Sequence, residues 1–308
     1  MHTDELEKII HRERKAVVIV NTRSRSGKRH YRHILENLHR QGYQVVAAYP
    51  VLDPARLRDV LREATQRDAH LLIVGGGDGT VTAVANELAH REDIALGIVP
   101  LGTGNSTART LSIPLTVKQA VSTIVDGEVA DVDLGRIGDR YFLNTIAVGL
   151  TADAVRTSST RFKRYFGQLA YFLTGVSAFI KHRFFQCMIT AEGQEFVGDV
   201  HEVVVANGRF FGDTILTPDA SIQDGQLNVE TVERTNIWQF IWRMLRFLVF
   251  RRSGLSGEHH FSTTEVRIDT DPPQCIDIDG ESFITTPVTV SVEPRALKVM
   301  VPRHVMGI

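Results

Sequence analysis

Residues 71–80 read Leu-Leu-Ile-Val-Gly-Gly-Gly-Asp-Gly-Thr, an apolar run that passes directly into a glycine-rich turn. A short apolar run bounded by turn residues is typical of a strand buried on both faces of a parallel sheet. Glycines let backbone amides approach a phosphate chain closely, and a carboxylate can hold the Mg²⁺ that accompanies the phosphates. The stretch therefore predicts a phosphate-binding turn made of Gly75, Gly76, Gly77, Asp78, Gly79 and Thr80, with Asp78 as a metal ligand.

Apolar runs and helical patterns alternate through the first half of the chain. The expected strands are Ala16–Val20, Val45–Tyr49, Leu71–Val74 and Ala95–Val99, and the expected helices are Tyr31–Arg40, Pro54–Arg67 and Val81–His90. Pro54 suits a first helical turn, and Asp53 is placed to cap it. This order predicts a three-layer α/β domain with a parallel sheet, in which ligands bind at the carboxyl ends of the strands.

Two more turns follow expected strands of this sheet. The turn Asn21–Lys28 is basic and hydroxyl-rich, and the turn Pro100–Asn105 repeats the glycine-rich design. Neither the Rossmann spacing nor the Walker lysine pattern is present, so the usual dinucleotide and P-loop sites do not fit. The candidate nucleotide-binding residues in the two turns are Asn21, Arg23, Ser26, Gly27, Gly102, Thr103, Gly104 and Asn105.

The second half of the chain is rich in strand-like segments that lie close together in sequence. They are Tyr141–Val148, Gln186–Thr190, His201–Ala206, Gln226–Val232, Glu265–Asp269, Gln274–Asp279 and Val288–Val292. Such spacing predicts an antiparallel, β-sandwich-like domain, here with two helical insertions. We therefore expect an α/β nucleotide-binding domain at residues 1–131 and a β-rich domain at residues 132–294, with residues 295–308 as a candidate segment that completes the first domain.

Composition narrows the class of protein. With 308 residues, 43% of them hydrophobic, the chain is long enough for two packed domains, and its formal charge of -1 gives no general argument for nucleic-acid binding. Cys187 and Cys275 are too few for a disulfide framework, and the polar start does not resemble a signal peptide. The most apolar stretch, Ile237–Phe250, is too short and too charged to cross a bilayer. We therefore expect a cytoplasmic protein.

The two glycine-rich turns together resemble the diacylglycerol kinase catalytic-domain family, which includes bacterial lipid kinases and sphingosine and ceramide kinases. The match rests on Gly-Gly-Asp-Gly-Thr at residues 76–80 and on Pro-Leu-Gly-Thr-Gly-Asn at residues 100–105, and it extends over nearly the whole chain. The resemblance implies ATP bound in a cleft between an α/β domain and a β-rich domain. One departure is Ser106, which stands where the family usually has an aspartate.

The segment Ile276-Asp-Ile-Asp-Gly-Glu281 places carboxylates at the end of an expected strand. A hydroxyl that attacks a phosphate needs a base, and a carboxylate commonly takes that proton. The family has a similar Asp-Gly-Glu whose aspartate is taken as the base. We therefore predict Asp279 as the base and Glu281 as a metal-binding or positioning partner.

A second acidic turn, Thr217–Leu227, also has a counterpart in the family. The resemblance implies a structural Mg²⁺ near Asp224, although an Asp-Gly turn forms without a metal.

Two amphipathic segments suggest contact with lipid. Ala154–Ala191 lacks acidic residues, and in Ile237–Phe250 the residues Gln239, Arg243 and Arg246 line one side of an expected helix. Such faces often belong to a protein core, but basic rims also attract anionic lipid headgroups. The predicted partner is a lipid substrate at the membrane surface, with peripheral contact at the inner membrane face; a homodimer is left open.

These features together predict an ATP- and Mg²⁺-dependent lipid kinase that phosphorylates a hydroxyl of a diacylglycerol-like lipid. An NAD kinase-like phosphotransferase is the nearest alternative, because NAD kinases share a Gly-Gly-Asp-Gly-Thr turn. A non-catalytic nucleotide or lipid sensor is the third possibility, and Ser106 keeps it open.

Overall fold

The chain divides into two compact units that exchange short segments. In this computed structural model the described residues are 1–23, 25–150, 152, 179, 184–212, 214–215, 217–239, 241–242, 259–280 and 282–303. The first unit contains residues 1–134, 221–225 and 293–308, and the second contains residues 135–220 and 226–292. The expected boundaries were 131/132 and 294/295. The inclusion of residues 221–225 in the first unit had no signal in the sequence.

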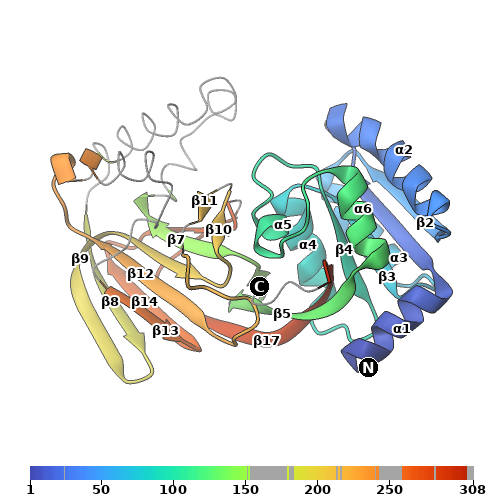
Figure 1. Cartoon of the computed structure of the whole chain (residues 1–308). Helices are drawn as coiled ribbons and strands as arrows, with labels where there is room; N and C mark the ends of the chain where they lie inside the picture. Colours follow the sequence, from blue (N-terminus) through green and yellow to red (C-terminus); the bar gives the residue numbers. More distant parts are fainter. Residues whose placement is uncertain are drawn as a thin grey trace. The chain divides into compact units, whose positions relative to one another are not determined.

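The first unit is built on a parallel sheet (Figure 1). Its strands run in the order β17-β4-β3-β1-β2, and each neighbouring pair is parallel. The strands are β1 (Lys15–Asn21), β2 (Gln44–Val51), β3 (Leu71–Gly76), β4 (Ala95–Pro100) and the end of β17 (Val288–Val301). All residues of β3 and β4 are buried, as the apolar runs predict for central strands. The four expected strands are therefore confirmed.

Helices cover both faces of this sheet, so the predicted three-layer α/β architecture is confirmed. The helical elements are α1 (Thr3–Glu13), α2 (Arg25–Arg40), η1 (Pro54–Arg56), α3 (Leu57–Ala64), α4 (Asp78–Leu88), α5 (Ser106–Thr110) and α6 (Val117–Asp126). Helices α2 and α6 contact each other, whereas α3, α4 and α5 form a second group. Asp53 accepts a 3.0 Å hydrogen bond from the Ala55 amide and caps η1, as expected.

The second unit is antiparallel throughout its described strands. They are β6 (Arg140–Phe142), β7 (Thr145–Gly149), β8 (Phe185–Ala191), β9 (Gln194–Ala206), β10 (Phe210–Phe211), β11 (Thr214–Ile215), β12 (Leu227–Glu233), β13 (His259–Thr263), β14 (Glu265–Asp271), β15 (Cys275–Ile278), β16 (Ser282–Thr285) and the start of β17. The end of β5 (Glu128–Ile137) also pairs with β6. The predicted β-sandwich-like domain is confirmed, and most residues of the two expected helical insertions lie outside the described residues.

Strand β9 organises this unit because it changes partners along its length. Residues 194–200 pair with β8, and the part that ends at Ala206 lies between β7 and β12. The long strand thus serves two groups of strands, and alternate side chains from both groups form one apolar core that includes Phe142, Phe185 and Val203. The expected strand His201–Ala206 was only the second half of β9. Similarly, the expected strand Tyr141–Val148 is interrupted between β6 and β7.

Glu230 is a buried acid on β12, opposite Val204 on β9 and His260 on β13. Burial, and to a smaller extent the charge of Asp219, raises the pKa of the Glu230 carboxyl to about 7. The His260 ring lies 3.7 Å away and opposes this effect only when it is protonated. Glu230 is therefore neutral in the folded protein at pH values where it is ionised in the unfolded chain.

We predict that Glu230→Gln stabilises the protein at alkaline pH. Because the folded pKa exceeds the unfolded value, the wild type loses stability as the pH rises from about 4.5 to about 7, by an amount on the order of 3 kcal/mol. Urea unfolding at about pH 5 should give nearly equal free energies for the two proteins, and at about pH 8 the variant should be more stable. A difference that does not change with pH would contradict the assignment.

Candidate active site

The three predicted phosphate-binding turns lie in the first unit, at the carboxyl ends of β1, β3 and β4. These strands are neighbours in the sheet, which brings their ends to one edge. The turns are shorter than expected, because α2 already begins at Arg25 and α4 at Asp78. Ser26, Gly27 and Lys28 are thus helical residues rather than loop residues, and Asp78, Gly79 and Thr80 form the first turn of α4.

The first and second turns are joined by a side-chain hydrogen bond. Asn21 Nδ2 donates to Thr80 Oγ1 at 3.1 Å, and Asn21 Oδ1 accepts the Arg23 amide at 3.1 Å. Gly27 packs directly on this turn, since an added Cβ would lie 2.0 Å from the Asn21 carbonyl oxygen. The side chain of Ser26 lies outside the described residues. Asn21 therefore positions both the end of β1 and the start of α4.

The second and third turns touch through their glycines. A Cβ on Gly102 would lie 2.6 Å from the Gly77 Cα, so a side chain there would force the two backbones apart. The Leu101 amide donates to the Gly76 carbonyl oxygen at 2.8 Å. Such close backbone contact brings the peptide groups of two turns together at one edge of the sheet, and backbone N–H groups at such positions can bind phosphate.

Asn105 holds the shape of the third turn. Its Oδ1 accepts the Gly102 amide at 2.9 Å, and its Nδ2 donates to the Gly102 carbonyl oxygen at 3.1 Å. The residue itself is buried and left-handed, with φ 52°. Gly104 is held by Arg109, whose Nε donates to its carbonyl oxygen at 3.0 Å, while Thr103 is exposed at the rim. The sequence analysis missed Arg109, because an arginine three residues into a short helix carries no distinctive pattern.

Asp78 connects the second turn to α5. Its Oδ1 accepts the Thr107 amide at 3.1 Å, which places the carboxylate at the amino ends of both α4 and α5. Among the described residues there is no group of three or more acidic, histidine or cysteine side chains that could form a complete metal site. Asp78 fits Mg²⁺ as one protein ligand, because Mg²⁺ commonly takes one or two carboxylates and completes its shell with phosphate oxygens and water.

Asp279 lies in the second unit, directly after β15. Its Oδ2 accepts the Leu143 amide at 2.9 Å, and its Oδ1 accepts the Asn144 and Thr145 amides at 3.0 and 3.1 Å. The residue is left-handed with φ 49°, and its own amide donates to the Thr145 carbonyl oxygen. These four bonds fix the Asp279–Gly280 turn against the start of β7. Glu281 lies outside the described residues.

Asp224 lies in the turn of residues 221–225, which belongs to the first unit. Its neighbour Gly225 donates its amide to Asp133 Oδ2 at 2.7 Å, and the Arg295 amide donates to Asp133 Oδ1 at 2.8 Å. Asp133 is 2% exposed and thereby links β5, the turn and β17. A charged residue between the apolar Val132 and Leu134 of β5 was the available sequence signal for this residue, which was overlooked.

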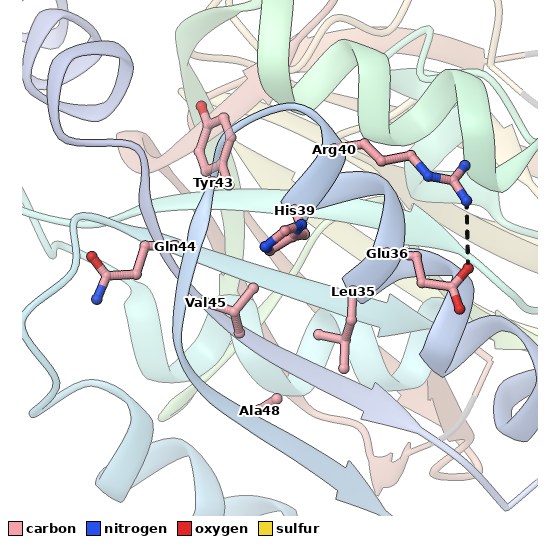
Figure 2. Close-up of a pocket in the computed structure, with 8 residues that line it drawn as sticks. All are labelled: Leu35, Glu36, His39, Arg40, Tyr43, Gln44, Val45 and Ala48. Atoms are coloured by element: carbon pink, nitrogen blue, oxygen red, sulfur yellow. Dashed lines mark ion pairs between the residues drawn. The ribbon is translucent and has the colours of Figure 1, made fainter.

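A pocket of about 700 Å³ lies away from the three turns (Figure 2). It is lined by Leu35, Glu36, His39 and Arg40 of α2 and by Tyr43, Gln44, Val45 and Ala48. Strand β2 begins at Gln44, so the pocket extends toward the amino end of a strand, whereas the glycine turns follow the carboxyl ends. Arg40 is already paired with Glu36 at 3.9 Å. The pocket and the three predicted turns are therefore separate features of the first unit.

The amphipathic segments expected to face lipid are described only in part. Most of Ala154–Ala191, and residue 240 and residues 243–250 of the second segment, lie outside the described residues. Within the described part of the chain, no helix has the length and apolar character needed to span a membrane.

Comparison with known proteins matches each unit to a known domain family. The profile of the diacylglycerol kinase catalytic domain matches residues 15–137, and that of the YegS C-terminal NAD kinase beta sandwich-like domain matches residues 144–301. A protein named diacylglycerol kinase from Bacillus subtilis (strain 168) is 27% identical over 259 residues, which cover 82% of this chain and 84% of the relative. The chain belongs to the diacylglycerol kinase catalytic-domain family, which is a family of kinases.

Solved structures share the fold over almost the full length. A diacylglycerol kinase from Bacillus anthracis str. Sterne superposes with a TM-score of 0.78 at 23% identity and covers 96% of this chain and 98% of its own. An NAD kinase from Archaeoglobus fulgidus, solved in complex with ATP, superposes with a TM-score of 0.53 at 12% identity, with 94% of each chain covered. At these identities the two structures establish the fold alone.

We predict that Gly102→Ala disrupts the contact between the second and third turns. The added Cβ would meet backbone rather than a movable side-chain end, so we expect a loss of about 1–3 kcal/mol in the free energy of unfolding. Gly193→Ala is the matched control, because Gly193 lies in open space with φ +81°. The control should lose about 1 kcal/mol from backbone strain alone. Weaker binding of inorganic triphosphate to Gly102→Ala, but not to the control, would link the contact to phosphate binding. Unchanged stability and binding in Gly102→Ala would contradict it.

Proposed function

We propose that this protein is an ATP- and Mg²⁺-dependent lipid kinase that transfers the γ-phosphate to a hydroxyl of a diacylglycerol-like lipid. The observation that carries the proposal is the contact of three turns, two of them glycine-rich, at one sheet edge in a chain of the diacylglycerol kinase family. The related protein named diacylglycerol kinase supports a lipid acceptor, and the NAD kinase solved in complex with ATP supports ATP as the donor.

In the proposed reaction, the acceptor oxygen forms a bond to the γ-phosphorus, and the bond to the bridging oxygen breaks to release ADP. The backbone of the three turns would hold the phosphates, with Asn21 and Asn105 keeping the turns in register. Asp78 would hold Mg²⁺, which supplies positive charge to the phosphate oxygens. The proton of the acceptor hydroxyl would pass to a carboxylate.

Asp279 is our proposed base, with Glu281 as its metal-binding or positioning partner. Three backbone amides fix the Asp279 carboxylate in one position, from which it could accept the proton of an acceptor hydroxyl. The same bonds also suit a second role, in which Asp279 only positions the turn and Glu281 takes the proton. The two roles differ in what conservative substitutions should do.

The test is transfer of radiolabelled γ-phosphate from ATP to a panel of extracted lipids and to NAD. We expect label in a diacylglycerol-like lipid, and label in NAD alone would overturn the proposal. ATP binding without transfer to any acceptor would favour a sensor. Asp78→Asn should weaken Mg²⁺ binding, so that a higher Mg²⁺ concentration is needed for half-maximal activity.

We predict that Asp279→Asn lowers kcat by about 10²-fold or more if Asp279 is the base. Glu281→Gln is the matched variant, because it removes the other carboxylate of the sequence Asp279-Gly280-Glu281. If Glu281→Gln abolishes transfer and Asp279→Asn chiefly lowers the free energy of unfolding, Glu281 is the base and Asp279 an anchor. Urea unfolding of both variants separates loss of chemistry from loss of fold.

A further inference from the structure

Trp238 and Trp242 are the only two tryptophans in the chain, and both are exposed at one place. Their exposed fractions are 77% and 65%, the two largest among the exposed large apolar side chains of the described residues. Both positions are helical and lie four residues apart, so the two rings share one face of the helix. A tryptophan side chain buries 150–250 Å² when it is covered, so this face presents a large unpartnered area.

The start of this helix is firmly positioned. The Asn236 side chain accepts the Gln239 amide at 2.9 Å, and the Gln239 side chain accepts the Asn236 amide at 3.2 Å, which is a reciprocal capping box. Trp238 is therefore the second residue of the helix. Because the capping box fixes the start of the helix, it also fixes the exposed position of Trp238.

The chain that leads into the helix is also anchored to the sheet. The Arg234 amide donates to the Asp199 carbonyl oxygen at 2.9 Å, and the Arg234 guanidinium lies 4.0 Å from the centre of the Phe184 ring. His201 Nε2 lies 3.3 Å from the Thr235 carbonyl oxygen. In Figure 1 this helical segment, drawn in orange, follows β12 in the β-rich unit. These contacts fix the backbone that precedes the helix, and so they fix where the two tryptophan rings project from the second unit.

The surrounding sequence identifies what covers the rings. From Thr235 to Gly257 there is no acidic residue, and the basic residues are Arg243, Arg246, Arg251 and Arg252. A basic segment that carries tryptophans matches an anionic lipid surface, where the apolar ring enters the headgroup region and its N–H stays hydrated. A second copy of the chain would bring the same positive charges together, and so it fits less well.

We propose that Trp238 and Trp242 dock this protein on anionic membranes by inserting into the headgroup region. The inference rests on the proposed function, because a kinase whose acceptor is a membrane lipid must reach the bilayer surface. It names the residues that make the contact, and it depends on neither the phosphate-binding turns nor Asp279.

Intrinsic fluorescence tests the proposal directly, since all tryptophan emission comes from these two residues. Vesicles of phosphatidylcholine with phosphatidylglycerol should shift the emission of the full-length protein to shorter wavelength, and brominated acyl chains should quench it. Trp238→Phe and Trp242→Phe each leave a single reporter, so both rings can be followed separately. Unchanged emission in the presence of anionic vesicles would overturn the proposal.

Flotation with the same vesicles gives the energetic test. Trp238→Ala and Trp242→Ala should each lower the vesicle partition coefficient about tenfold, which corresponds to about 1.4 kcal/mol. Val197→Ser is the matched control, because Val197 is 59% exposed on β9 of the same unit, and it should bind vesicles as the wild type does. Equal partition of the alanine variants and the wild type would overturn the proposal. An emission shift that depends on protein concentration and not on vesicles would also do so, because it would assign the rings to a dimer.

Activity measurements separate this inference from the proposed function. Both alanine variants should lose activity on an acceptor embedded in anionic vesicles and retain it on a short-chain acceptor dissolved in water. Equal loss on both acceptors would overturn the docking role. If no acceptor is phosphorylated but the vesicle response persists, the proposed function fails and the docking site stands.

Discussion

The first unit depends on one backbone contact, the approach of Gly77 to Gly102. A Cβ on Gly102 would lie 2.6 Å from the Gly77 Cα, so the ends of β3 and β4 can meet this closely only without side chains. The neighbouring bonds follow from this contact: Leu101 reaches the Gly76 carbonyl oxygen, and Asp78 reaches the Thr107 amide. Glycine at these positions therefore does more than permit a turn. It sets the spacing of the peptide groups that would face a phosphate chain.

Aspartate carboxylates that accept hydrogen bonds from several backbone amides are a second feature, and they occur in both units. Asp279 accepts hydrogen bonds from three backbone amides in the second unit, and Asp133 accepts them from two backbone amides in the first unit. Charge-assisted bonds of this kind are stronger than neutral ones, and removal of the acceptor would leave several amides without a partner. Each aspartate thereby fixes a turn through hydrogen bonds to the backbone of a distant segment. An acidic residue beside a glycine can thus have a structural role that resembles a catalytic one in the sequence.

Much of the fold could be predicted because its central strands are buried on both faces. The apolar runs at β1, β3 and β4 are unambiguous, and strand alternation with helices permits few topologies. The starts of helices were harder to predict from the sequence. Helix α2, for example, begins at Arg25, where the serines and basic residues resemble a loop. The full length of β9 was also missed, because its first half is largely exposed or half-buried and lacks an apolar run. The exposure of Trp238 and Trp242 was not predicted, because both residues are flanked in the sequence by apolar residues typical of a core.

The sequence by itself determined the two-unit architecture, the family and the three turns, because apolar periodicity and glycine spacing are local properties of the chain. Tertiary structure decided what those local signals could not. It showed that Asn21 meets Thr80 across 59 residues and that Asp279 meets Leu143 across 136 residues. It also placed residues 221–225 in the first unit and left both tryptophans uncovered. These facts depend on contacts between distant segments, and such contacts exist only once the sheets have formed.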